Sequence, residues 1–219
     1  PVFLFFLNFA ILTYFPALGF PLTEPRNYFF ANLLYMTVNF AVMLLIFRRT
    51  LWQSLREFEG KMLLSVLIGF GMCYGANLVL TTAYTVLDIM PENYNQEAVN
   101  SLLGGYPLAM TLCTVVLAPL AEECLFRGVL FAPLARRCLP AAYALSMFLF
   151  AGMHVFQFLG SMTAANTILC LSLYLPASFS LCWVYQKTGN IWACIFLHMF
   201  INFQSVLASL LRSLMQAFL

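Results

Sequence analysis

The sequence predicts an all-α fold, a polytopic membrane helical bundle of about seven (six to eight) transmembrane helices. Of the 219 residues, 63% are hydrophobic and 8% are charged, and the mean hydropathy is +0.90. A soluble domain carries about 25% charged residues, so the bilayer must be the main solvent of this chain. The apolar residues form runs of about 20 residues, the length that crosses a bilayer, separated by short polar segments. Each run must be helical, because lipid cannot satisfy open backbone groups.

The runs define the expected spans in chain order. The opening PVFLFFLNFAILTYF has no basic residues ahead of its apolar run, so we interpret it as a first span and not as a secretory signal. A shorter helix is expected within the loop from Glu97 to Leu103. No linker, low-complexity segment or internal repeat is visible, so we expect a single domain, 1–219, with a motif core at 106–212. The expected spans are 2–20, 28–47, 62–87, 106–135, 141–158, 163–186 and 190–212.

Charges in the loops predict the orientation of the bundle. In a seven-span arrangement three loops rich in Lys and Arg fall on one side, and the acidic loop between the third and fourth spans falls on the other. The positive-inside rule then places the N-terminus in the cytoplasm. Short loops favour the plasma membrane of a prokaryote, and a net charge of +2 gives no indication of a nucleic-acid partner. The basic residues are Arg48, Arg49, Arg56 and Lys61, then Arg136 and Arg137, then Lys187; the acidic ones are Asp88, Glu92 and Glu97.

Two further sequence features concern packing. The third span contains a Gly-x-x-x-Gly pair, Gly71 and Gly75, which we interpret as a site where helices pack closely. The seven cysteines lie mostly in apolar runs and form no C-x-x-C pair, so they are expected to be free thiols and not a metal cluster.

The fourth span carries APLAEECLFR, with three charged residues where hydrocarbon is expected. Each charge costs about 2.5–3.5 kcal/mol at a helix centre, so they must face the bundle interior. Glu123 and Arg127 are four residues apart and should pair on one helix face. Glu122 lies about 100° further round the helix and has no such partner in its own span. We therefore expect Glu123 to be structural and Glu122 to be available as a general base.

Other polar residues reach the same depth from neighbouring spans. At about 1.5 Å per residue, Glu122 lies about 21 Å from Arg136 and His154 about 20 Å past Ala141. His198 and Asn202, four residues apart, lie about 16–22 Å past Lys187. We expect these side chains to line one polar cavity within the membrane.

Several chemistries fit this set of residues. No Asp lies in the candidate site, so a Ser-His-Asp triad is unsupported, and no His-Glu-x-x-His helix occurs. Glu122, His154 and His198 could form a His-His-Glu zinc site with an open position. Without metal, Glu122 and His154 could activate a water, with His198 and Asn202 donating to the oxyanion. A proton-coupled transporter also uses buried Glu, His and Arg, but the spans show no inverted repeat.

Three motifs resemble those of one membrane family. APLAEECLFRGVLF, FAGMH and TGNIWACIFLHMFIN occur in the order and spacing of the CPBP family, also called CAAX protease and bacteriocin-processing or ABI. The resemblance spans residues 118–202 and implies an intramembrane glutamate protease similar to type II CAAX prenyl endopeptidases. It assigns Glu122, His154, His198 and Asn202 to catalysis, and Glu123, Arg127 and Phe150 to support.

The resemblance also bears on cofactors and partners. It implies a water mechanism without a metal cofactor, although zinc stays an alternative. The expected substrate is a hydrophobic or lipidated peptide presented at the lipid bilayer, such as a prenylated CAAX sequence. Some family members are non-proteolytic and act in bacteriocin immunity or as scaffolds, which is the main alternative. The oligomeric state has no signal in the sequence.

Overall fold

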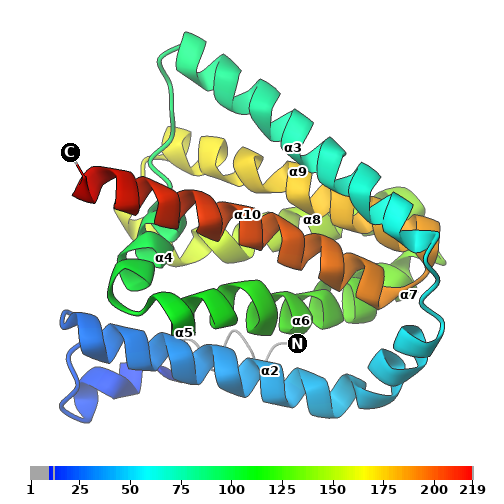
Figure 1. Ribbon diagram of the computed structural model, residues 1–219, viewed down its shortest axis with the longest axis horizontal. Helices are drawn as coiled ribbons and strands as arrows, with labels where there is room; N and C mark the ends of the chain where they lie inside the picture. The colour runs from blue at the N-terminus through cyan, green and yellow to red at the C-terminus, as the bar shows by residue number, and fades with distance from the viewer. Residues whose placement is uncertain (1–9, 12, 219) are drawn as a thin grey trace.

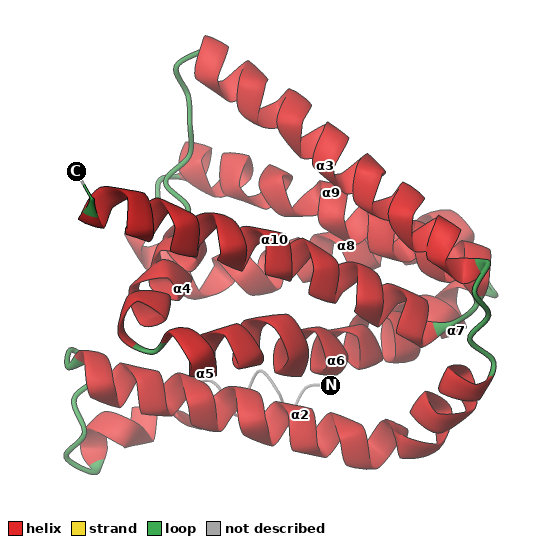
Figure 2. Ribbon diagram, in the orientation of Figure 1, coloured by secondary structure: helices red, strands yellow, loops and turns green. Residues whose placement is uncertain are grey.

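A computed structural model describes residues 10, 11 and 13–218, and within these residues the protein is helical without a β-strand. Six of the helices are long and apolar enough to cross a membrane. They pack side by side as a bundle (Figures 1 and 2). The all-α polytopic prediction is therefore confirmed.

The elements follow one another with short connections. Five of the spans are α2 (Pro25–Arg56), α3 (Met62–Val86), α8 (Leu139–Val155, continued by the 3₁₀ segment η3, Phe156–Ser161), α9 (Ala164–Thr188) and α10 (Ile191–Ala217). The fourth predicted span runs from Pro107 to Ala135 as α5 (Pro107–Leu112), η1 (Cys113–Leu117), α6 (Ala118–Glu123), η2 (Cys124–Phe131) and α7 (Ala132–Ala135). The short helix α4 (Tyr94–Gly105) confirms the one expected in the loop before it.

The second to seventh predicted spans correspond to these helices, most of their ends to within a few residues. The largest difference is in α2, which continues to Arg56 and not to residue 47. Arg, Gln and Leu are good helix formers, so the helix continues past the apolar run into the basic segment. The predicted first span, 2–20, lies mostly outside the described residues, and its described part is helical at residues 10, 11 and 13–17.

The fourth span passes through two prolines without breaking. Each proline follows a π-helical segment, η1 before Pro119 and η2 before Pro133. Proline lacks the N–H that an α-helix needs, and its ring crowds the carbonyl one turn earlier. The wider π turn relieves this crowding, and such turns often lie at functional sites. The fourth span therefore passes Pro119 with a local change of helical register and without a break.

Helix α10 is the centre of the bundle. It contacts α2, α3, α4, α9 and the fourth span, and Figure 1 shows it between α3 and the fourth span. Its first turn is fixed by Asn190, whose Oδ1 accepts the Trp192 N–H at 2.9 Å and whose Nδ2 donates to the Ser54 carbonyl at 2.7 Å. Gly189, with φ of 62°, ends α9 and reverses the chain into α10. These contacts set the depth of the residues two and three turns further along α10.

The basic loops lie together at one end of the bundle. The α2–α3, α7–α8 and α9–α10 connections share that end, and the acidic α3–α4 connection lies at the other (Figure 1). The predicted separation of charge is therefore confirmed, while the cytoplasmic placement of the N-terminus stays a prediction.

The glycine pair predicted to pack closely in α3 is not the one that does so. A Cβ atom on Gly71 or Gly75 would meet nothing within 4 Å, so this pair does not mediate helix packing. The close approach is instead at Gly69, where a Cβ atom would lie 2.7 Å from Val184 Cγ2 and 2.9 Å from Leu197 Cδ2. Sequence spacing identifies a glycine motif but not the face that meets another helix.

Candidate active site

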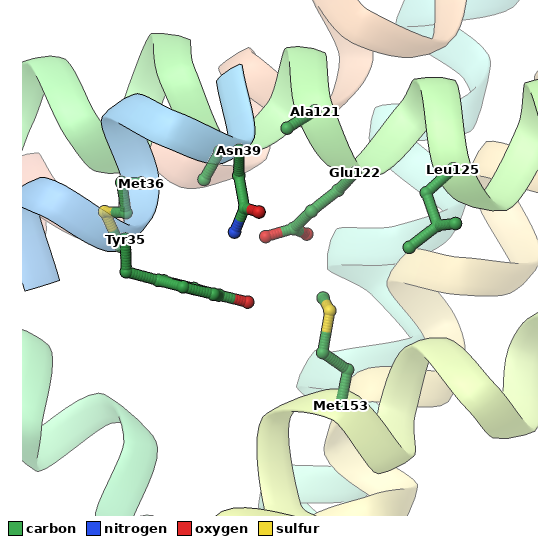
Figure 3. Close-up of a pocket in the computed structure, with 8 residues that line it drawn as sticks. Tyr35, Met36, Asn39, Ala121, Glu122, Leu125 and Met153 are labelled. Carbon is green, nitrogen blue, oxygen red and sulfur yellow. The ribbon is translucent and has the colours of Figure 1, made fainter. Parts of the chain in front are cut away.

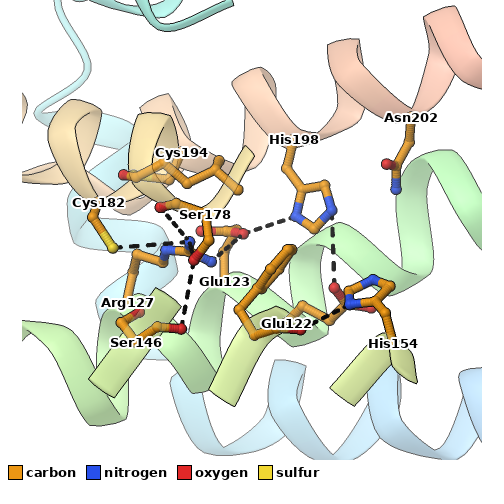
Figure 4. Close-up of polar contacts among 12 residues, drawn as sticks. Glu122, Glu123, Arg127, Ser146, His154, Ser178, Cys182, Cys194, His198 and Asn202 are labelled. Carbon is orange, nitrogen blue, oxygen red and sulfur yellow. Dashed lines mark hydrogen bonds and ion pairs between the residues drawn. The ribbon is translucent and has the colours of Figure 1, made fainter. Parts of the chain in front are cut away.

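Glu123 and Arg127 form a buried ion pair in the fourth span. Arg127 Nη1 lies 3.0 Å from Glu123 Oε1, and both side chains are 0% exposed. Arg127 Nη2 donates to the carbonyl and to Oγ of Ser178 on α9, both at 3.1 Å (Figure 4). The predicted pairing is confirmed, and it joins the fourth span to α9.

His198 joins this pair from α10. Its Nδ1 lies 2.8 Å from Glu123 Oε1, and its Nε2 lies 3.8 Å from Glu122 Oε2. The Phe150 ring lies 4.9 Å from the Arg127 guanidinium and 5.6 Å from the His198 ring. The cation–π contact and the buried ring keep water away from the ion pair. His198 thus contacts one glutamate directly and faces the other.

Glu122 faces a cavity on the other side of the helix. The cavity volume is about 60 Å³, and Glu122 is the only charged residue among those lining it. The Glu122 side chain is 20% exposed, and its Oε2 has no hydrogen-bond partner among the described residues. The sequence-based distinction between the two glutamates therefore matches the geometry. The lining residues are Tyr35, Met36, Asn39, Ala118, Ala121, Glu122, Leu125 and Met153 (Figure 3).

His154 is held in a fixed orientation at the end of α8. Its Nδ1 lies 2.8 Å from the Phe150 carbonyl oxygen, and its ring stacks on Tyr174 with 4.4 Å between centroids. A carbonyl only accepts hydrogen bonds, so Nδ1 carries the proton. In the neutral ring, Nε2 is then left as an acceptor.

Asn202 is tied to the π segment of the fourth span. Its Nδ2 donates to the Thr114 carbonyl at 2.8 Å. In η1 the Ala118 N–H bonds the Cys113 carbonyl, five residues earlier. The next donor in that pattern is Pro119, which has no N–H, so the Thr114 carbonyl is left open. The Asn202 amide occupies the place of the missing backbone donor.

The predicted residues surround Glu122 in more than one environment, and their catalytic roles stay a prediction. Glu122, Glu123, Arg127, His198 and Phe150 come together as expected. His154, His198 and Asn202, however, do not line the cavity of Glu122. The ion pair with Glu123 draws His198 inward, and the open carbonyl of η1 holds Asn202.

Comparison with known proteins addresses the three motifs directly. Residues 104–204 match the model of a family described as type II CAAX prenyl endopeptidase Rce1-like. We call residues 104–204, which are similar to this family, the Rce1-like region. The resemblance based on the motifs is confirmed, and every residue assigned to the site lies inside this region.

One curated relative also matches. It is the "Putative membrane peptidase YdiL" of Bacillus subtilis (strain 168), 28% identical over 166 residues, which cover 74% of this chain. The match covers 64% of the relative's own length. No solved structure matches the chain significantly. The alignment with YdiL is longer than the Rce1-like region, so the similarity to YdiL extends beyond that region.

The geometry also tests the alternative zinc site. Among the described residues no group of three or more His, Cys, Asp or Glu side chains has an arrangement that could hold a metal ion. Glu122, His154 and His198 therefore do not form a three-ligand set in this arrangement. We derive no catalytic step through a metal.

Several contacts around the Rce1-like region were not predicted from the sequence. Thr114, Tyr174 and Ser178 contact Asn202, His154 and Arg127, but they resemble many other residues of apolar helices. Tyr35 and Asn39 reach the cavity from α2, which lies outside the Rce1-like region. Asn39 had only a general signal, since an amide within an apolar span is costly unless it has a partner. Asn32 in the same span carries the same signal.

Proposed function

We propose that the protein is an intramembrane endopeptidase that hydrolyses a peptide bond of a membrane-presented substrate by means of an activated water. The observation that carries the proposal is the division between the two adjacent glutamates. Glu123 is fully buried and its Oε1 is paired with Arg127 and His198, whereas Glu122 is partly exposed, lines a cavity and has no hydrogen-bond partner for Oε2 among the described residues. A carboxylate held in this way is suited to accept a proton from water.

Glu122 and His154 have complementary roles in this proposal. Glu122 removes a proton from the water while the oxygen of the water attacks the carbonyl carbon of the substrate. His154, with its Nδ1 proton held by the Phe150 carbonyl, keeps Nε2 as an acceptor on the α8 side of the site. We assign it a supporting role in holding the attacking water.

The surroundings of Glu122 favour its uptake of a single proton. The Glu123 carboxylate has Arg127 as its counter-charge at 3.0 Å, whereas Glu122 has no Arg or Lys paired with it among the described residues. In a medium of low dielectric constant, the proton that the water loses neutralises the Glu122 carboxylate and so removes a buried charge. Glu122 can therefore hold that proton until the leaving amine takes it.

The tetrahedral intermediate requires donors for its oxyanion. We assign this role to the Nε2 proton of His198 and to the second N–H of Asn202, whose first N–H binds Thr114. Collapse of the intermediate breaks the C–N bond, and the proton held by Glu122 passes to the leaving amine. The products are a carboxylic acid and an amine.

The substrate class follows from the surroundings of the site. The cavity lies between apolar helices, and the matched family is described by its prenyl endopeptidases. We therefore propose a hydrophobic or lipidated peptide of CAAX type. A volume of about 60 Å³ admits water but not a peptide, so the helices lining the cavity must separate when substrate enters.

The test is cleavage of a fluorogenic prenylated CAAX peptide by the purified protein in detergent. Glu122→Gln keeps the shape of the side chain but removes the base, so we expect kcat to fall by about 10²–10⁴-fold. Glu59→Gln is the matched control, because Glu59 is exposed and pairs with Lys61 at the surface. Each protein is measured with and without a strong chelator.

The outcomes separate the alternatives. Cleavage by the wild type and the Glu59 variant, unaffected by chelator, supports the proposed mechanism. Loss on chelation that zinc restores would favour the metalloprotease. An unchanged kcat in Glu122→Gln would rule out Glu122 as the base. No cleavage by the wild type would contradict a CAAX-type activity and favour a non-proteolytic role.

A further inference from the structure

Helix α2 contributes two polar side chains to the wall opposite Glu122. Tyr35 and Asn39 line the cavity together with Glu122, and Figure 3 shows Asn39 directed toward the Glu122 carboxylate. Both residues lie outside the Rce1-like region, which begins at residue 104. The motifs that define the region therefore do not describe the whole site.

Asn39 is a buried amide with an unmet acceptor. It is 6% exposed, and its Oδ1 has no hydrogen-bond partner among the described residues. Glu122 Oε2 is in the same condition. A buried acceptor without a partner costs stability, so a pair of them around one cavity calls for a donor between them. The two oxygens cannot satisfy one another, because neither carries a hydrogen when Glu122 is ionised.

A water molecule fits the cavity and can donate two hydrogen bonds. A buried water needs about 10–15 Å³ of accessible volume and two to four polar partners. The cavity offers about 60 Å³, the two unmet oxygens and the hydroxyl of Tyr35. A single water has two O–H groups, one for each oxygen.

We infer that Asn39 is a water-positioning residue of this site. Its Oδ1 and Glu122 Oε2 accept the two hydrogens of one water. The inference rests on the proposed function for its catalytic meaning. When Glu122 takes one hydrogen as a proton, Asn39 holds the other, and the lone pair of the oxygen stays directed at the substrate carbonyl. The attacking water is thus oriented by a helix outside the Rce1-like region.

A positioning role and a structural role predict opposite effects on stability. Leucine has nearly the shape of asparagine without its polar atoms. Oδ1 of Asn39 accepts no hydrogen bond from another described residue, so Asn39→Leu breaks no protein contact of that oxygen, and we expect its Tm to equal or exceed that of the wild type. If Asn39 were structural, the same change would lower Tm.

The kinetic test uses the prenylated peptide and the purified full chain. For Asn39→Leu we expect kcat to fall by about 100-fold, because the attacking water loses one of the contacts that orient it. KM should be almost unchanged, because Asn39 is not expected to bind the substrate itself. Asn39→Asp keeps the acceptor oxygen and should recover most of the lost kcat. Asn32→Leu is the matched control on the same helix, since Asn32 donates to the Tyr28 carbonyl and does not line the cavity. A kcat for Asn39→Leu within threefold of the wild type overturns the inference.

A second measurement does not depend on cleavage. Tm is determined for Asn39→Leu, Glu122→Gln and the double variant. Residues that share one water should be coupled, so the shift in the double variant should differ from the sum of the single shifts. Additive shifts overturn the shared water. Coupled shifts in a protein that cleaves no peptide would instead support the shared water and contradict the proposed protease function.

Discussion

At the scale of single residues, two adjacent glutamates of identical chemistry have different surroundings. The rotation of about 100° between neighbouring helical residues places Glu123 toward α9 and α10 and Glu122 toward α2. Glu123 is enclosed by Arg127 and His198, while Glu122 is partly exposed and lines the cavity. The ion pair thus stabilises the helix orientation that turns Glu122 toward the cavity.

This division predicts different effects on stability. Arg127→Met leaves the Glu123 carboxylate buried without its guanidinium, and breaking a buried pair in this way costs about 3–5 kcal/mol. We expect a large fall in Tm for Arg127→Met and a partial recovery in the double variant Glu123→Gln/Arg127→Met. The measurement is thermal unfolding in detergent. A Tm for Arg127→Met close to that of the wild type would show that the pair does not stabilise the fold.

Sequence reasoning at this scale succeeded where the contact is local. The pairing of Glu123 with Arg127 follows from a spacing of four on one helix. The bond from Asn202 to Thr114 could not be predicted, because it depends on a π turn formed ahead of Pro119. Asn39 is visible in the sequence only as an amide within an apolar span, and its place opposite Glu122 depends on the packing of α2 on the fourth span.

At the scale of elements, the span boundaries were predictable and the packing faces were not. A hydrophobic run must match the thickness of the bilayer, so its length is visible in the sequence. Which face of a helix meets its neighbour depends on the whole bundle. In α3 the predicted pair Gly71 and Gly75 lies in open space, and Gly69 makes the close approach to α9 and α10.

Leucine substitutions on α3 test this assignment. Gly69→Leu would insert a side chain against Val184 and Leu197, each of which has an atom less than 3.0 Å from the point where the new Cβ would lie. Overpacking of this kind costs about 1–3 kcal/mol or more, so we expect Tm to fall. Gly71→Leu has nothing within 4 Å and should leave Tm unchanged or raise it, because leucine is the better helix former. Equal effects of the two changes on Tm would contradict the assigned packing face.

At the scale of the whole molecule, the bundle has a basic end and an acidic end. The three basic loops lie together, and the positive-inside rule predicts that this end faces the cytoplasm. Cys138, in the basic α7–α8 connection, is exposed, whereas the other six cysteines are buried. The native chain therefore offers one accessible thiol at a known end.

Labelling from outside intact bacterial cells that express the protein tests the orientation. A membrane-impermeant maleimide should leave Cys138 unmodified until the cells are permeabilised. Glu92→Cys in a Cys138→Ser background places the accessible thiol at the acidic end, and we expect it to react without permeabilisation. Glu92 is exposed, and its backbone N–H and carbonyl, which bond Asn166, are kept in the variant. Labelling of Cys138 from outside, with protection of the new cysteine, would reverse the orientation.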